Sequence, residues 1–157
     1  MSLSFIKVPE YDLTLSNNNT VKYRPFLIKE EKILLMAVES KDEAEMNNAL
    51  VNIVQSCTLS KIDVTKLPVY DFEYLWLNIR GKSVGEQIDL KLKCPDDEKV
   101  SVDYSLKIED VKPDLNKKFE RKVEFDKDYG VIMKVPTIKH ISNKKTLLDL
   151  SYGLVRD

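Results

Sequence analysis

An alternation of polar and apolar positions near the N-terminus predicts a β-hairpin. The alternation runs over residues 12–16 and resumes over residues 21–24, and three asparagines at 17–19 separate the two runs. Asparagine tolerates the positive φ of a tight turn, so the two runs are expected to pair as neighbouring strands. Pro25 has no N–H to donate to a sheet, and it therefore ends the second strand or places it at a sheet edge.

Two helices are predicted to follow the hairpin. The first opens with the charged residues 29–32 and continues as six apolar residues at 33–38. Because such a run covers every side of a helix, we expect this helix to be buried on most sides. In the second helix, Ser40 followed three residues later by Glu43 forms the pattern of a capping box, and apolar residues then recur at helical spacing to about Cys57.

A third helix is expected to begin near Pro68, because a first helical turn tolerates proline. Glycine is the usual residue just after a helix, so this helix should end at Gly81 or Gly85. Its wide apolar stripe consists of Phe72, Tyr74, Leu75, Trp76, Leu77 and Ile79.

After Gly85 the period of the pattern changes from 3.6 to 2 residues, which is typical of strands. Ile88, Leu90 and Leu92 alternate with polar residues, the segment 95–98 turns the chain, and the alternation resumes through residue 104. We expect this hairpin to have one buried and one solvated face. Two more strands are expected at 119–125 and 131–135, and a last helix is expected within 145–155.

The order of these elements predicts an α+β fold in a single domain over residues 1–157. A unit of three helices carries an N-terminal β-hairpin and a C-terminal antiparallel sheet. Residues 28–85 are then mainly helical, residues 86–136 are mainly antiparallel strands, and residues 137–157 form a tail with the last helix. A length of 157 residues agrees with one domain whose core needs no disulfide support.

Charge and composition argue against several classes of protein. The chain has 25 Lys and Arg against 26 Asp and Glu, and this balance argues against a dedicated nucleic-acid binder, which usually has a basic excess. The longest uncharged apolar run has six residues, whereas a membrane span needs about 20. The N-terminus lacks the pattern of a signal peptide, so we expect a reduced cytoplasm, with Cys57 and Cys94 as free thiols.

No pattern of catalytic or metal-ligating residues stands out. His140, the only histidine, could in principle activate Cys57 or Cys94, but neither thiol lies in a nucleophile signature. Cys94 and Pro95 stand where a zinc knuckle would begin, yet the second ligand position is Asp97 and a second cysteine pair is missing. We therefore predict a non-enzymatic protein with no cofactor, no metal and no small-molecule substrate.

Four blocks of sequence resemble one family of phage proteins. They are residues 23–37, the helix that contains residues 47–50 and ends at Cys57, residues 67–86, and the strand pair around Cys94 and Pro95. In this order they are similar to the T-even-type bacteriophage baseplate hub or hub-assembly family, of the gene product twenty-six type. The resemblance covers roughly residues 20–136. Relatives often have a second cysteine after Cys94 and a longer helical C-terminal part, so neither a metal role nor the functions of that part are carried over.

The resemblance implies a late, non-enzymatic protein that helps to assemble the central hub of a contractile-tail baseplate. Its implied partners are other hub or tail proteins, with no nucleic acid and no membrane. It would act in the host cytoplasm during assembly, and the resemblance leaves open whether it stays in the virion as a structural protein or leaves as a chaperone. The residues alone leave two alternatives: a nucleic-acid-binding accessory protein that uses the lysines of residues 85–125, and a small hydrolase that uses His140.

Two groups of residues are candidates for a protein interface, because Tyr, Trp and Arg often anchor interfaces. The candidates are Arg24, Pro25 and Phe26, just after the second strand, and Tyr74, Leu77 and Arg80 on the third helix. Trp76 is expected to belong to the core. For both groups, packing inside the protein itself is the alternative.

Overall fold

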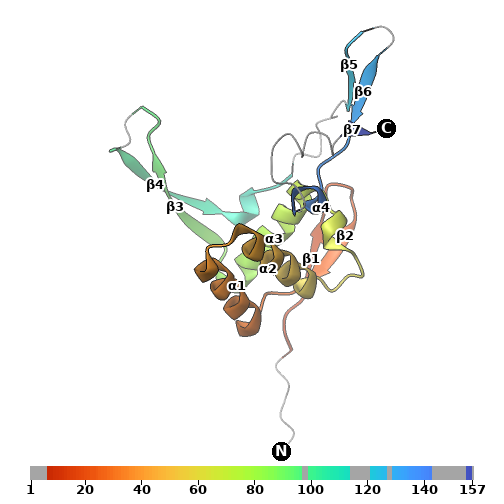
Figure 1. Cartoon of the computed structure of the whole chain (residues 1–157). Helices are drawn as coiled ribbons and strands as arrows, with labels where there is room; N and C mark the ends of the chain where they lie inside the picture. The colour runs from red at the N-terminus through yellow and green to blue at the C-terminus, as the bar shows by residue number, and fades with distance from the viewer. Residues whose placement is uncertain (1–6, 97–98, 114–120, 127–128, 143–154, 157) are drawn as a thin grey trace, which may run out of the picture.

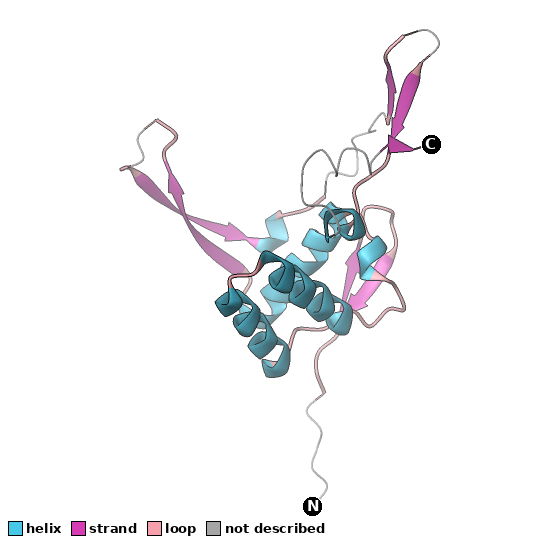
Figure 2. Cartoon of the chain, viewed as in Figure 1, coloured by secondary structure: helices cyan, strands magenta, loops and turns pink. Residues whose placement is uncertain are grey.

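Helices form the centre of the molecule, and the strands of the described residues make three small sheets, two of which extend away from it (Figures 1 and 2). In this computed structural model the described residues are 7–96, 99–113, 121–126, 129–142 and 155–156. The helices are α1 (Ile28–Ser40), α2 (Glu43–Cys57), α3 (Val69–Val84) and α4 (Ile138–Ser142), with short 3₁₀ turns η1 (Val64–Lys66) and η2 (Ile108–Asp110). The strands are β1 (Tyr11–Thr14), β2 (Thr20–Tyr23), β3 (Gln87–Lys93), β4 (Ser101–Lys107), β5 (Lys122–Glu124), β6 (Gly130–Met133) and β7 (Val155–Arg156). This mixture of helices and antiparallel strands confirms the predicted α+β class.

The predicted N-terminal hairpin is present and covers one side of the helices. β1 and β2 pair antiparallel, with Leu13 opposite Val21, and both side chains are buried. The turn between them uses an asparagine at positive φ, Asn18, as the pattern suggested. Past β2, Arg24 donates its backbone N–H to the Cys57 carbonyl at 2.9 Å, which ties the end of the hairpin to the end of α2.

The hydrophobic core lies where α2, α3 and the β1–β2 hairpin meet. Its members are Leu13, Leu15, Val21, Tyr23, Ile53, Val54, Cys57, Val64, Phe72, Leu75 and Ile79. One polar side chain is fully buried beside them. Asp71, in the first turn of α3, accepts hydrogen bonds from the backbone N–H of Ser16 at 3.0 Å and from its hydroxyl at 2.7 Å. Both carboxylate oxygens are thereby satisfied, and α3 is attached to the hairpin.

The prediction that residues 33–38 form a buried helix is wrong about burial. The segment is helical, but Leu35 is 58% exposed and Met36 is 61% exposed, and Ala37 is its only buried member. Helix α1 packs mainly along α2 and lies at the edge of the body, so a single side of it is covered. A run of apolar residues therefore does not establish that a helix is central.

The start of α2 also differs from the prediction. Asp42, rather than Ser40, caps the helix, and its carboxylate accepts from the N–H groups of Ala44 at 2.7 Å and Glu45 at 3.3 Å. Ser40 belongs to the last turn of α1 and donates its hydroxyl to the Ala37 carbonyl. The reversal of the chain is taken by Lys41, whose positive φ of 55° ends α1 two residues beyond the apolar run.

Helix α3 follows its prediction closely. It starts directly after Pro68, and it ends before Gly85, whose φ of 150° is open to glycine and strained for other residues. Gly81 lies within the helix, and it is needed for another reason. A Cβ atom there would stand 2.8 Å from Cδ1 of Ile108, so the absence of a side chain lets η2 pack against α3.

The β3–β4 hairpin forms with the predicted alternation, but its expected buried face is exposed. Ile88, Leu90 and Leu92 stand opposite residues 106, 104 and 102, which places all six apolar side chains on one face. Leu90 is 38% exposed, Leu92 is 50% exposed and Tyr104 is 51% exposed. The reason is that the hairpin projects from the helical body, so that none of the described elements covers this face (Figure 1).

The C-terminal strands are shorter than expected. β5 and β6 form a hairpin around residues 125–129, and β7 pairs with β6. The predicted helix at 145–155 lies outside the described residues except at its end, where residue 155 belongs to β7, and residues 119–120 of the predicted strand also lie outside them. Within the described residues, no helix is long and apolar enough to cross a membrane.

Candidate protein interface

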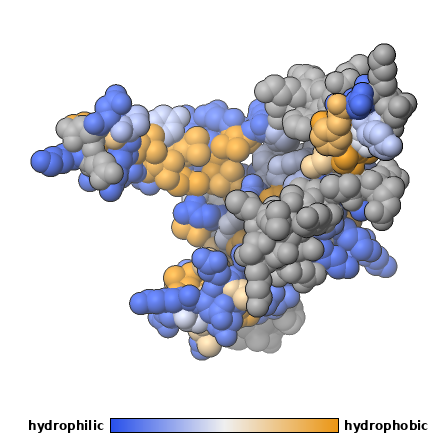
Figure 3. Space-filling view, turned by 45° about the horizontal axis from the view of Figure 1, so that its top comes forward, coloured by the Kyte–Doolittle hydropathy of each residue, from blue (hydrophilic) through white to orange (hydrophobic). Residues whose placement is uncertain are grey.

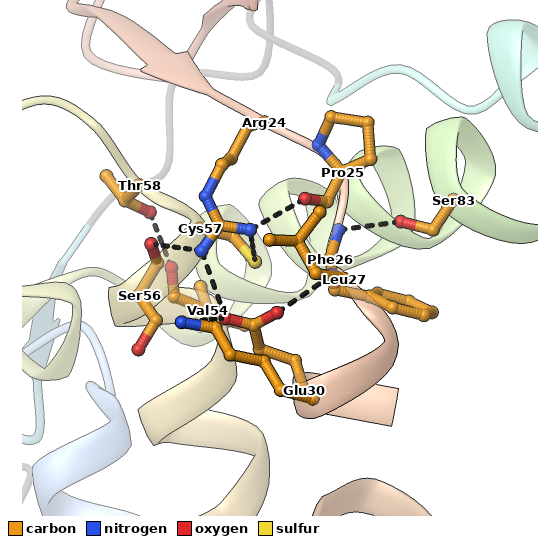
Figure 4. Close-up of polar contacts among 11 residues, drawn as sticks. Arg24, Pro25, Phe26, Leu27, Glu30, Val54, Ser56, Cys57, Thr58 and Ser83 are labelled. Carbon is orange, nitrogen blue, oxygen red and sulfur yellow. Dashed lines mark hydrogen bonds and ion pairs between the residues drawn. The ribbon is translucent and has the colours of Figure 1, made fainter. Parts of the chain in front are cut away.

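The corner between β2 and α1 is held together by the side chain of Arg24 (Figure 4). Its Nη2 donates to Glu30 Oε1 at 3.0 Å and to the Ser56 carbonyl at 3.2 Å, and its Nη1 donates to the Pro25 carbonyl at 2.9 Å. Nη1 also lies 3.7 Å from the sulfur of Cys57. One guanidinium thus joins the start of α1 to the C-terminal turn of α2, where a cation is also favoured by the helix dipole.

Glu30 connects the same cluster to the backbone at the start of α1. Its Oε2 accepts the N–H of Leu27 at 2.8 Å, three residues earlier, as the acidic residue of a capping box does. Only 4% of its side chain is exposed. Burial alone would raise the pKa of this carboxyl, but the bonds from Arg24 and Leu27 and the charges of Arg24 and Lys29 outweigh it. The pKa is therefore lower than usual, and the group is ionised at neutral pH.

Phe26 attaches this corner to α3. Its N–H donates to Ser83 Oγ at 2.9 Å, while that hydroxyl donates to the Ile79 carbonyl at 2.6 Å. Its ring stacks on Trp76 at a centroid distance of 6.1 Å and an interplanar angle of 19°. The three candidates Arg24, Pro25 and Phe26 are all partly buried, and the contacts described for them are internal.

The other three candidates, Tyr74, Leu77 and Arg80, follow one another at a spacing of three along α3, and all are partly buried. Tyr74 and Trp76 both pack against the core, as expected for Trp76. Arg80 differs from the others. Its Nη1 atom is buried and has no hydrogen-bond partner among the described residues, although the side chain as a whole is partly accessible. These three side chains thus lie on one stripe of α3, as the sequence indicated.

The residues considered for catalysis do not come together. Burial raises the pKa of the Cys57 thiol to about 11, so this thiol is protonated and unreactive at neutral pH. His140 contacts the residue just before its own helix, α4. Its Nδ1 lies 3.1 Å from the backbone nitrogen of Thr137 and 2.9 Å from the Thr137 hydroxyl. Cys94 lies at the far end of the projecting β3–β4 hairpin, away from α4 (Figure 1). Among the described residues, no group of three or more His, Cys, Asp or Glu side chains could hold a metal ion.

Sequence reasoning missed the partnership of Arg24 with Glu30, although one signal for it was present. Leu27 and Glu30 have the spacing of a capping box, which would have placed the carboxylate at the start of α1. The contact with Ser56 and Cys57 joins residues about 32 positions apart, and no local pattern indicates it.

A comparison with protein-family models matches residues 8–156 to the family described as T4 bacteriophage base plate protein. The chain belongs to this family. The match confirms the resemblance to T4-type baseplate proteins, and it covers the helical body and both projecting hairpins. A structural or assembly role in the phage baseplate follows from membership of the family. No curated protein and no solved structure matches the chain.

Proposed function

We propose that this baseplate protein acts in assembly of the central hub of a contractile tail, through contacts with other hub or tail proteins and without catalysis. The observation that carries the proposal is the family match over residues 8–156. The hub-type resemblance of residues 23–37 and 67–86 supports the more specific role. Assembly in the host cytoplasm, as a late protein that either stays in the virion or leaves as a chaperone, belongs to the same proposal.

The exposed apolar side chains support a role in protein contacts. Baseplate proteins function inside a larger assembly, and surfaces that are apolar in the isolated chain are the usual sites of such contacts. In this chain they occur on α1, on the β3–β4 hairpin and on the β5–β6 hairpin, where Phe125 is 72% exposed and Tyr129 is 75% exposed.

The stripe of Tyr74, Leu77 and Arg80 on α3 is proposed as one contact surface for a hub or tail protein. Tyrosine and arginine are frequent anchors of interfaces, and all three side chains keep part of their surface accessible. Arg24, Pro25 and Phe26 make internal contacts at the neighbouring corner, and in this proposal they hold the surface in shape.

The test is capture of baseplate proteins from phage-infected cells by the tagged chain, with mass spectrometric identification. The double variant Tyr74→Ala with Arg80→Ala should lose a hub or tail protein that the wild type captures, while its melting temperature stays within a few degrees of wild type. The control is Glu10→Ala with Lys61→Ala, which truncates two exposed side chains outside α1, α3 and the two projecting hairpins.

Capture of no baseplate protein by the wild type would contradict the proposed function. Normal capture by the Tyr74 and Arg80 variant would contradict the proposed surface and leave the function standing. Equal loss in the variant and in the control would show that the effect is not specific to α3.

A further inference from the structure

The β3–β4 hairpin is a two-stranded sheet with two open edges. Within the described residues β3 pairs with β4 alone, and the hairpin extends away from the helices (Figure 1). An isolated two-stranded sheet is marginally stable in water, and a third strand or a covering layer is normally needed. Figure 3 shows apolar side chains gathered along this arm, on the left of the view. The arm is therefore an incomplete sheet.

The hydrogen bonds of the hairpin reveal which backbone groups remain free on β3. Cys94 donates to the Val100 carbonyl at 2.9 Å, and Ile108 donates to the Glu86 carbonyl at 3.0 Å, so even-numbered residues bond across the hairpin. Because the pattern alternates in an antiparallel ladder, the odd-numbered residues of β3 direct N–H and C=O outward. These residues are Gln87, Asp89, Lys91 and Lys93.

We propose that β3 pairs antiparallel with β3 of a second copy of this chain, about a two-fold axis at Leu90. The seven residues of β3 then face the same seven in reverse order. Asp89 stands opposite Lys91 of the second copy, and by symmetry Lys91 stands opposite its Asp89. On the apolar face, Ile88 stands opposite Leu92 of the second copy and Leu90 opposite its equivalent. The result is a four-stranded antiparallel sheet in the order β4-β3-β3-β4.

Charge complementarity selects this register. The pairing about Leu90 joins odd-numbered residues with odd-numbered residues, which is what the free N–H and C=O groups require. A two-fold axis at Asp89 would place Asp89 against its own copy. An axis at Lys91 would oppose Asp89 to Lys93 twice, but it would place Lys91 against its own copy and would pair only residues 89–93 of the strand. An axis at Leu92 would oppose Lys91 to Lys93 twice. Like charges directly opposite each other destabilise a sheet, whereas the axis at Leu90 forms two pairs of opposite charge.

The edge of β4 fits a second copy less well. An axis at Tyr104 opposes Asp103 to Ser105 and forms no pair of opposite charge. An axis at Ser105 does oppose Asp103 to Lys107, but it pairs residues 103–107 alone, because the chain turns into η2 at the buried Ile108. Pairing through β3 uses the whole strand, and it places the two helical bodies at opposite ends of the new sheet.

The register can be tested directly with two variants in which the charge at position 89 or at position 91 is reversed. Sedimentation equilibrium at about 100 µM detects a dimer with a dissociation constant in the micromolar range, and wild type should show twice the 18.2 kDa of the chain. The Asp89→Lys variant alone, and the Lys91→Asp variant alone, should each show a single-chain mass, since each now opposes like charges. An equimolar mixture of the two should regain the doubled mass, because opposite charges face each other again. Recovery in the mixture cannot come from misfolding of either variant.

A cysteine at the two-fold axis provides a second measurement. Opposed residues of a pair without hydrogen bonds have Cα atoms about 4.5 Å apart, within the range of a disulfide. In a Cys94→Ser background, Leu90→Cys should therefore form a covalent dimer under mild oxidation. Leu92→Cys is the matched control, because its copies would be separated by about 13 Å or more along the strands.

A single-chain mass for wild type at this concentration overturns the proposal. Doubled mass in both charge variants alone, or equal cross-linking of the Leu90→Cys and Leu92→Cys variants, overturns the register. Self-association of the isolated chain does not depend on the proposed role in the hub.

Discussion

At the scale of single residues, the Arg24–Glu30 pair is the most consequential polar contact of the described structure. The two side chains are 15% and 4% exposed, and between them they satisfy the start of α1 and the last turn of α2. A charge removed from water this far is tolerable only while its partner remains. The pair therefore fixes the corner on which α1, α2 and α3 meet.

Replacement of Arg24 by alanine should lower the free energy of unfolding by about 2–3 kcal/mol, below the full cost of breaking a buried pair because Arg24 keeps some exposure. The loss arises because the buried Glu30 carboxylate is left without its cation. Adding Glu30→Gln to this variant should recover part of the loss, since a neutral amide is less costly to bury. Urea denaturation of both variants provides the measurement, and an unchanged midpoint in Arg24→Ala would contradict this role.

Stability should also depend on pH through Glu30. Its folded pKa lies below the reference value of 4.5, so the ionised carboxylate stabilises the native state fully above that pH. The contribution is lost as the pH falls through the lower, folded pKa and the native carboxylate takes up a proton. The difference in free energy of unfolding between wild type and Glu30→Gln should therefore shrink from about pH 7 to about pH 3. A difference that stays constant over this range would show that the charge of Glu30 contributes nothing.

At the scale of elements, helices of similar composition have different environments. Helix α3 is central, and Leu75 and Ile79 are fully buried. Helix α1 is equally apolar over residues 33–38 but packs on one side, against α2. Apolar side chains stay exposed on α1 and on the β3–β4 hairpin, and such surfaces often form contacts with other proteins.

Replacing one leucine in each helix by alanine should lower the stability of the protein by different amounts. Leu75→Ala should cost about 2–5 kcal/mol, the usual range for a buried large-to-small change. Leu35→Ala should cost under about 1 kcal/mol, because this side chain is 58% exposed. Thermal or urea unfolding of the two variants checks the difference. Equal losses would show that α1 is buried after all.

Features that depend on nearby residues could be predicted from the sequence, whereas features that depend on long-range packing could not. The turn at Asn18, the start of α3 after Pro68 and the alternation along β3 depend on nearby residues, and all were predicted. The exposure of Leu35 and Leu90 was not, because hydropathy records which side chains are apolar and not whether another layer covers them. Tyr74, Leu77 and Arg80 belong to the predicted third helix, and their use as an interface stays a prediction.

At the scale of the whole molecule, a small helical body carries two projecting hairpins (Figure 1). Its arms expose apolar side chains and strand edges, which proteins normally cover or pair. The chain belongs to the T4 bacteriophage base plate protein family, and a baseplate is built from many protein contacts, so such surfaces are expected in a protein of this family. We therefore propose the two arms and the stripe on α3 as contact surfaces.

The most direct test of the account is electron microscopy of lysates from phage in which this protein is not made. We predict filled heads without complete tails, with hub proteins found unassembled in the soluble fraction, and normal tails when the wild-type chain is supplied from a plasmid. Complete baseplates on tailed, infectious particles in the absence of the protein would contradict the central claim.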